Sequence, residues 1–244
     1  MARYKTVDEI KNMCEEASKD MNSFYKAKCV NYKGKTKEKV LYTEVIAEWL
    51  LKNVKKLKEI ESVRRELSYN PKHKGKLGRG DKDSEKNIAI RIFNQKCYND
   101  GLLIIDYQIP LNNHRADKRG EIDLLALNEK EKCVYIFELK KEKSKESMLR
   151  CVIEGYTYLK TICKEKLLND FGIDGSYSLK TAPLVFEGGT QYDEFMDKNR
   201  GFLHELMKKL GIVPFFLSKD AESKFVISKI KNKHEKSINT RKLL

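Results

Sequence analysis

The stretch GEIDLLALNEKEKCVYIFELKKEKSKESMLRCVIEGYTYL, residues 120–159, decides the fold of this chain. Two short runs of apolar and β-branched residues, 121–128 and 133–141, are separated by four polar residues, a spacing typical of two antiparallel strands joined by a hairpin. The apolar positions from about Lys145 to Leu168 then recur at helical spacing. The stretch therefore predicts a strand, a short turn, a second strand and a long helix.

Further elements extend this pattern in both directions. On the N-terminal side, residues 84–100 predict a helix that Asp83 or Ser84 can cap, and residues 102–111 predict a strand. On the C-terminal side, the pattern predicts a strand at 179–189, a helix at 192–211 and two closing strands at 212–218 and 224–230. The order from residue 84 onward is α-β-β-β-α-β-α-β-β, for which a mixed sheet flanked by helices is the natural packing. The strand–helix–strand unit across 133–187 predicts a crossover between parallel strands that are neighbours or near-neighbours.

The beginning of the chain has a different, helical character. Apolar residues at helical spacing predict helices within 7–24 and 41–60, and the polar, Gly- and Lys-rich residues 70–84 predict an exposed loop. We therefore predict a helical extension over residues 1–75 and a second domain over residues 76–244 that ends in a short basic tail. The pattern leaves open whether the extension is a separate subdomain or packs on the same core.

The composition favours a polyanionic partner. Lys and Arg number 50 against 36 Asp and Glu, which gives a net charge of +14, and clustered basic side chains release counterions from a phosphate backbone. An anionic membrane surface is the competing interpretation, but the chain has no long apolar span. Because residues 1–20 lack the apolar stretch of a signal peptide, we expect a cytoplasmic protein that binds no membrane. The six cysteines form no CxxC pair and the four histidines are scattered, which argues against a Cys/His zinc site.

Three ionisable residues can meet at one edge of the predicted sheet. Glu138 and Lys140 are two positions apart on one strand and therefore leave the same face, and the hairpin brings Asp123 level with them. Both strands are otherwise strongly apolar, so these charges cost on the order of several kcal/mol unless they are paired or hold a metal ion. Two carboxylates with a backbone carbonyl suit Mg²⁺ or a similar ion. A neighbouring lysine can orient a water molecule or stabilise a phosphoryl transition state.

The arrangement Asp123…Glu138-Leu139-Lys140 resembles the PD-(D/E)XK nuclease superfamily. The resemblance covers about residues 84–217, because the α-β-β-β-α-β order is that family's core. It implies a restriction-endonuclease-like fold in which Asp123, Glu138 and the Leu139 carbonyl are metal ligands and Lys140 is the catalytic lysine. Ile122 stands where many members have a proline.

The same resemblance implies further site residues. Many members have an acidic residue on the helix before the first strand, for which Glu85 is the best match and Glu44 or Glu48 a weaker one. Some members use polar residues of the helix after the lysine strand. Here the residues that recur every four positions on one face of that helix are Arg150, Glu154 and Tyr158. A salt bridge and simple packing are the alternative interpretations of this face.

Basic residues outside these elements are candidates for contact with a phosphate backbone. His114, Arg115 and Lys118 lie in the loop before Asp123, where they either face bound nucleic acid or remain solvated. The glycines of residues 72–82 and the Gly34-Lys35-Thr36 triplet lack the spacing of a phosphate-binding P-loop.

We therefore predict a Mg²⁺- or Mn²⁺-dependent deoxyribonuclease, with endonuclease activity, DNA as its partner and homodimerisation as an option. The predicted metal ligands are Asp123, Glu138, Leu139 and Glu85, and the predicted nucleic-acid-binding residues are Arg115, Lys118, Arg150 and Tyr158. The alternative is a catalytically inactive nucleic-acid-binding or partner-binding module on the same fold.

Overall fold

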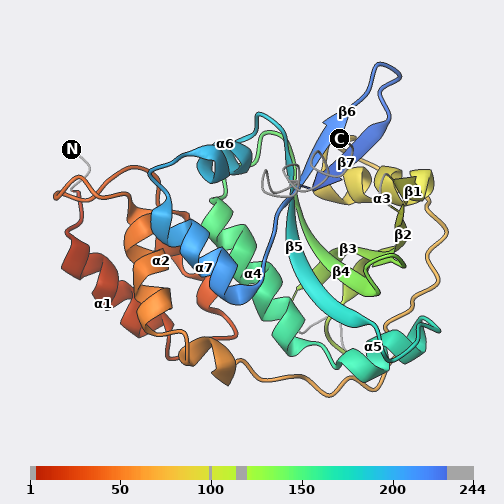
Figure 1. Ribbon diagram of the computed structural model, residues 1–244, viewed down its shortest axis with the longest axis horizontal. Helices are drawn as coiled ribbons and strands as arrows, with labels where there is room; N and C mark the ends of the chain where they lie inside the picture. Colours follow the sequence, from red (N-terminus) through yellow and green to blue (C-terminus); the bar gives the residue numbers. More distant parts are fainter. Residues whose placement is uncertain (1–3, 99–100, 114–119, 230–244) are drawn as a thin grey trace, which may run out of the picture.

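The computed structural model describes residues 4–98, 101–113 and 120–229. Five of the helices lie together on one side of the molecule, and a mixed sheet lies on the other side with α3 and α5 beside it (Figure 1). The strands are β1 (Cys97–Tyr98), β2 (Leu102–Pro110), β3 (Glu121–Asn128), β4 (Cys133–Lys140), β5 (Ser178–Phe186), β6 (Phe215–Lys219) and β7 (Phe225–Lys229). The helices are α1 (Val7–Ala17), α2 (Tyr42–Lys52), α3 (Glu85–Gln95), α4 (Met148–Thr161), α5 (Lys164–Asp170), α6 (Thr190–Met196) and α7 (Gly201–Leu210). Short 3-10 turns are η1 (Phe24–Lys26), η2 (Lys28–Asn31) and η3 (Lys56–Glu59).

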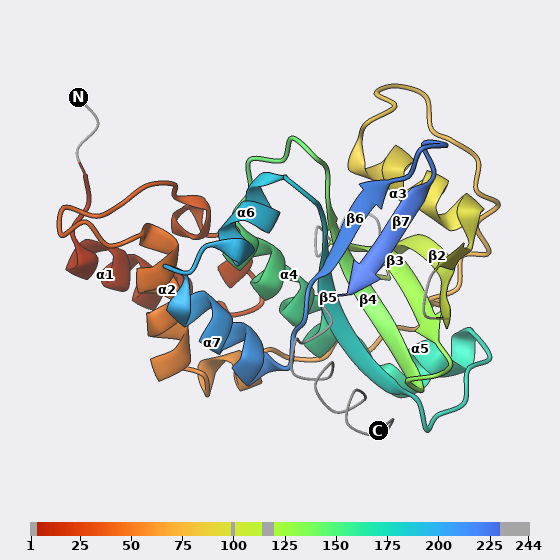
Figure 2. The same ribbon diagram turned by 45° about the horizontal axis from the view of Figure 1, so that its top comes forward.

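The seven strands follow one another across the sheet in sequence order. Strands β1 to β4 form an antiparallel meander, β4, β5 and β6 are parallel, and β7 is antiparallel to β6. Helix α4 makes the crossover, and it leaves β4 and β5 as direct parallel neighbours in the register Glu138↔Pro183 and Lys140↔Val185. The predicted mixed sheet flanked by helices is confirmed, as is the parallel pairing across the crossover. The sheet is strongly curved (Figure 2).

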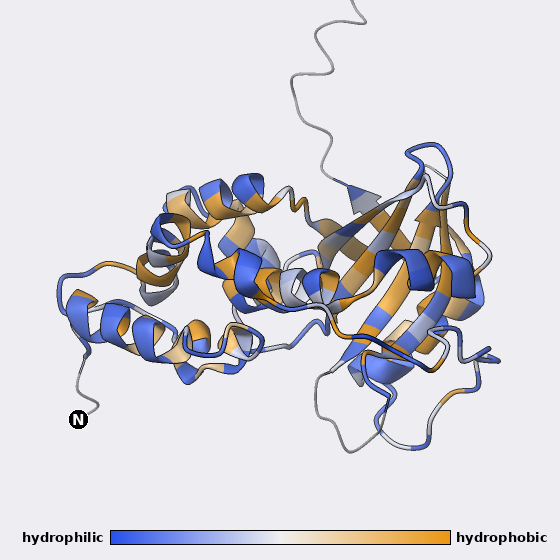
Figure 3. Ribbon diagram, turned by 90° about the horizontal axis from the view of Figure 1, so that it is seen from below, coloured by the Kyte–Doolittle hydropathy of each residue, from blue (hydrophilic) through white to orange (hydrophobic). Residues whose placement is uncertain are grey.

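Both faces of the central strands are covered. On one face, Val134 and Ile136 of β4 pack in the same core as Val152 of α4. On the opposite face, Phe137 packs in a second core with Ile88 of α3. Every residue of β4 is consequently buried, and the hydropathy colouring shows the central strands as mainly hydrophobic (Figure 3). The surface-pair interpretation of Glu138 and Lys140 on an edge strand is therefore wrong.

The N-terminal helices belong to the first of these cores. Ile10 of α1 and Ile46 of α2 share it with Val152 of α4 and Leu203 of α7. The ring of Phe24 stacks on Trp49 of α2 at a centroid distance of 5.8 Å. Residues 4–60 thus lie on the helical side of the molecule and extend a hydrophobic core that reaches the sheet. The boundary predicted at residue 75 falls in the loop that runs from η3 to α3.

Several helices end earlier than the apolar pattern predicts. Ser84 caps α3 as expected, since its hydroxyl accepts from the Asn87 N–H, but the helix ends at Gln95 because Lys96 adopts a positive φ of 63°. Cys97 then pairs with β2. The long helix predicted from Lys145 begins only at Met148, after the Ser147 cap, and extended backbone at Ile162 separates α4 from α5. The predicted helix 192–211 is also two helices.

No helix in the described part of the chain has the length and apolar character that crossing a bilayer requires.

Candidate functional site

Asp123 lies where β3 and β4 separate. The pairing of the two strands runs from Asn128↔Cys133 to Leu124↔Phe137. At the next position of β3, Asp123 Oδ2 accepts a hydrogen bond from the Leu139 N–H at 2.9 Å. A side-chain carboxylate there takes the place of a backbone acceptor. The separation of the strands opens the sheet at the point where the alternation of β4 presents Glu138 and Lys140.

The Lys140 ammonium group lies in a cluster of carboxylates. Its Nζ is 2.7 Å from Glu138 Oε1, 2.7 Å from Glu146 Oε2 and 3.3 Å from Glu154 Oε2. Lys140 and Glu138 are each only 4% exposed. Burial lowers the pKa of Lys140, but the charges of Glu138 and Glu154 outweigh it and leave that pKa raised. The lysine is therefore a permanently charged donor held between β4 and α4.

The carboxyl groups of Asp123 and Glu138 both take up a proton more readily than a free carboxyl group. Burial raises the pKa of Asp123 to about 7, although Lys140 and the Leu139 N–H favour its charged form. Burial also raises the pKa of Glu138, and the Asp123 charge adds to this rise. Glu138 Oε2 is buried without a hydrogen-bond partner. A second cation close to Asp123 and Glu138 would offset both effects.

Glu85, on the first turn of α3, belongs to the same group of charges. Its Oε1 accepts the Lys141 N–H at 3.1 Å, which ties α3 to the end of β4, and its charge contributes to the raised pKa of Asp123. The weaker matches lie in other environments. Glu44 is buried and accepts the N–H groups of Phe202 and Leu203 at the start of α7, and Glu48 pairs with Lys52.

Helix α4 presents its i, i+4 face to Lys140. Glu154 contacts the lysine directly, Arg150 Nε lies 3.5 Å from Glu154 Oε2, and the Tyr158 hydroxyl donates to Glu154 Oε1 at 3.0 Å. Arg150 also pairs with Glu146 at 3.1 Å. Tyr158 is only 4% exposed, and in this structure it supports Glu154. The nucleic-acid contacts predicted for Arg150 and Tyr158 stay predictions.

Two glycines allow the close packing that builds this site. A Cβ on Gly155 of α4 would lie 2.5 Å from Thr181 Oγ1 of β5, and one on Gly120 would lie 2.3 Å from the Tyr158 hydroxyl oxygen. Both separations are shorter than van der Waals contact permits. The helix therefore approaches the sheet closely only because these positions lack a side chain.

Sequence reasoning missed two residues of the site. Gln108 lies on β2 opposite Asp123, between the pairs Tyr107↔Leu124 and Ile109↔Ile122, and its Nε2 donates to Asp123 Oδ1 at 3.0 Å. Glu146 precedes α4 and reaches Lys140. The available signals were a polar residue within the apolar run 102–111 and an acid four residues before Arg150.

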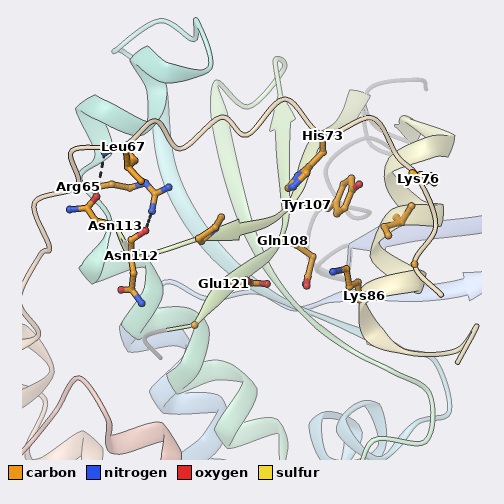
Figure 4. A pocket seen from close by; sticks show the side chains of 14 residues that line it. Arg65, Leu67, His73, Lys76, Lys86, Tyr107, Gln108, Asn112, Asn113 and Glu121 are labelled. Atoms are coloured by element: carbon orange, nitrogen blue, oxygen red, sulfur yellow. Dashed lines mark hydrogen bonds between the residues drawn. The ribbon is translucent and has the colours of Figure 1, made fainter. Parts of the chain in front are cut away.

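A cleft of about 950 Å³ opens beside Gln108 (Figure 4). The loop before α3, the helix itself and strand β2 form its walls. Its charged and polar lining includes Arg65, His73, Lys76, Lys86, Gln108 and Glu121. The cleft is thus mainly basic, and Gln108, which lines it, also donates to Asp123.

Some predicted residues cannot be placed. His114, Arg115 and Lys118 lie outside the described residues, as does the basic tail from residue 230.

The donor set fits a hard divalent cation in its chemistry, since it consists of carboxylate oxygens, of which Glu138 Oε2 is buried without a hydrogen-bond partner. In this network the carboxylates outnumber the cationic groups: they are Glu85, Asp123, Glu138, Glu146 and Glu154, against Lys140 and Arg150. The described residues nevertheless contain no group of three or more His, Cys, Asp or Glu side chains arranged to hold a metal ion.

Comparisons of the chain with protein-family models, with curated proteins and with solved structures find no significant match. The interpretation of the site therefore depends on its own geometry and chemistry.

Proposed function

We propose that the protein is a metal-dependent nuclease with a restriction-endonuclease-like fold, and that it hydrolyses DNA phosphodiester bonds. The observation that carries this proposal is the Lys140 ammonium group, buried against Glu138 and one strand away from Asp123. A fold gains little stability from burying such a charge cluster. Such a buried group of charges is typical of a site that acts on a substrate. Apart from the two-residue strand β1 and the short helix α5, the element order α3-β2-β3-β4-α4-β5 is the one expected for the core of the superfamily that the sequence resembles.

Asp123 and Glu138 are the residues proposed to hold Mg²⁺ or Mn²⁺, with the Leu139 carbonyl and Glu85 as further oxygen ligands. The unpartnered Glu138 Oε2 and the raised pKa of Asp123 support this assignment. Such an ion stabilises the negative charge that develops on a phosphate and lowers the pKa of a water molecule.

The protein's own residues have separate tasks in this proposal. Lys140 presents a charged donor to the phosphate or to the attacking water. Glu154, itself held by Tyr158, orients that lysine. Gln108 and the Leu139 N–H fix the two oxygens of Asp123.

A second candidate function is an inactive nucleic-acid-binding or partner-binding module on the same fold. One observation favours it. Lys140 Nζ forms an ion pair with Glu138 Oε1, so the lysine itself supplies positive charge where a metal ion would be expected. In that case binding is independent of divalent ions and no cleavage occurs.

The test is cleavage of labelled DNA with and without Mg²⁺ or Mn²⁺. We expect Lys140→Ala to reduce cleavage at least about 100-fold while DNA binding persists, whereas Lys208→Ala, at an exposed position of α7, leaves cleavage unchanged. Cleavage that survives Asp123→Ala overturns the assignment of the site. Binding without cleavage under every divalent condition supports the second candidate.

A further inference from the structure

The basic cleft borders the proposed active site, and Gln108 is the side chain between them. The Gln108 side chain lines the cleft and donates to Asp123. Glu121, two residues before Asp123, lines it as well. We therefore expect a polymer bound at Asp123 to extend past Gln108 into this cleft, whose lining Figure 4 shows.

The cleft carries positive charge suited to phosphate groups. Lys76 and Lys86 are exposed at its wall. Arg65 is only 6% exposed, and its guanidinium donates to the backbone carbonyls of Asn112 and Ser68. These carbonyl partners carry no net charge, and the Tyr69 ring at 4.9 Å and the charge of Asp170 offset the Arg65 charge only in part.

The cleft also contains a fixed aromatic surface. The His73 ring stacks on Tyr107 with a centroid distance of 4.4 Å and an interplanar angle of 24°, and Phe93 packs against Tyr107 at 5.0 Å. His73 Nδ1 lies 2.9 Å from Oδ1 of the buried Asp106, which fixes the ring's orientation. The His73 side chain remains 30% exposed. An oriented, partly exposed ring beside cationic side chains is the combination with which proteins bind single-stranded nucleic acid.

The size of the cleft suits a single strand of nucleic acid better than a duplex. A volume of about 950 Å³ lies at the upper end of the range for small-ligand sites, so it accommodates a few nucleotides. A double helix keeps its bases stacked on one another and offers no free base face to His73. We propose that this cleft binds a single-stranded segment of the substrate, with phosphates at Arg65, Lys76 and Lys86 and one base stacked on His73. This inference rests on the proposed function, because it gives the substrate of the same site a single-stranded form.

The experiment measures binding in EDTA, so that its outcome is independent of cleavage. Fluorescence anisotropy compares a labelled single-stranded DNA oligonucleotide, its duplex, an RNA of the same sequence and an oligonucleotide with abasic positions. We expect the single strand to bind more tightly than the duplex, and the abasic strand to bind at least about fivefold more weakly than the intact one. The RNA shows whether the cleft distinguishes the two sugars.

The variant His73→Asn tests the stacking contact. Asparagine retains a donor for Asp106 but has no ring, so we expect it to weaken binding of the intact strand at least about fivefold and to leave binding of the abasic strand unchanged. An equal loss for both strands overturns the stacking role, since a structural defect would not depend on the base.

The double variant Lys76→Ala/Lys86→Ala tests the phosphate contacts. We expect it to reduce the slope of log K against log salt by about 1.4, at about 0.7 per phosphate contact. The matched control Lys208→Ala/Lys209→Ala removes the same charge from exposed positions of α7 and should leave the slope unchanged. Duplex binding as tight as single-strand binding, or equal effects of the two double variants, contradicts the proposal. If divalent-dependent cleavage is absent while these binding results hold, the proposed function fails and the cleft assignment stands.

Discussion

At the scale of a single residue, Gln108 has a strained backbone and a side chain that contacts a proposed metal ligand. Its φ of 46° lies in a region that non-glycine residues adopt at a cost. The pairing of β2 with β3 is irregular between Ile104 and Asp106, and the strained residue that follows points its amide at Asp123. Strain that persists in a strand where a side chain meets a carboxylate network suggests that the contact matters for function.

We predict that Gln108→Gly separates stability from activity. Glycine adopts the positive φ without strain, which offsets the loss of the hydrogen bond to Asp123 and the greater freedom of glycine in the unfolded chain, so the free energy of unfolding should change by less than about 1 kcal/mol. Cleavage should fall about 10- to 100-fold, because Asp123 Oδ1 loses its donor. Thermal denaturation and cleavage rates measure the two effects. The control is Ser223→Gly, which has a similar φ of 62° in an exposed turn and should leave cleavage unchanged. Full activity in Gln108→Gly would show that the amide does not position Asp123.

The proximity of Asp123, Glu138 and Lys140 could be predicted at this scale, because strand alternation and a short hairpin determine it. Gln108 and Glu146 could not. The position of Gln108 depends on an irregular register between β2 and β3, and Glu146 reaches Lys140 from a connection whose conformation follows from the packing of α4. Neither feature leaves a periodic signal in the sequence.

At the scale of elements, the distance between α4 and the sheet controls the site, because Glu154 must reach Lys140 across it. Gly155 sets this distance. A Cβ at this position would meet Thr181 Oγ1 at 2.5 Å, whereas its next contacts, with Glu138 Cβ and Thr181 Cβ, are ordinary at 3.7 Å. Thr181 cannot easily turn away, because its hydroxyl donates to the Ile136 carbonyl.

We predict that the effect of Gly155→Ala changes sign with residue 181. In the natural background the added methyl group displaces α4 and lowers the free energy of unfolding by about 1–3 kcal/mol. In a Thr181→Ala background the clash is absent, and the higher helix propensity of alanine should raise stability by up to about 1 kcal/mol. Urea denaturation of the four proteins gives the coupling energy. Independent, additive effects of the two substitutions would show that Gly155 does not set the spacing.

The strands could be predicted more accurately than the helices for a physical reason. β3 and β4 are buried from both sides, so their apolar runs end where burial ends. Helix ends depend instead on caps and on single backbone angles. The Asn199 N–H donates to Asp197 Oδ1 at 2.9 Å between α6 and α7, a local turn that interrupts a pattern which is apolar on both sides of it.

At the scale of the whole molecule, charged residues are grouped locally by sign, whereas the hydrophobic core extends across most of the elements. The chain carries a net charge of +14, yet the cluster around Lys140 is rich in carboxylates and the adjoining cleft is basic. The first of the two apolar cores, in contrast, joins residues from α1 to β6 in a single cluster. This continuity bears on how the N-terminal helices relate to the sheet.

We predict that the chain unfolds in one cooperative transition. Trp49 is its single tryptophan and lies in α2 against Phe24, so its fluorescence reports on the N-terminal helices. Far-UV circular dichroism reports on all helices and strands together. Because Ile10 and Ile46 share a core with Val152 and Leu203, loss of the N-terminal helices would expose the apolar faces of α4 and α7. The urea midpoints from the two signals should therefore agree to within about 0.2 M. A tryptophan transition at distinctly lower urea would instead identify residues 1–75 as an independently unfolding extension.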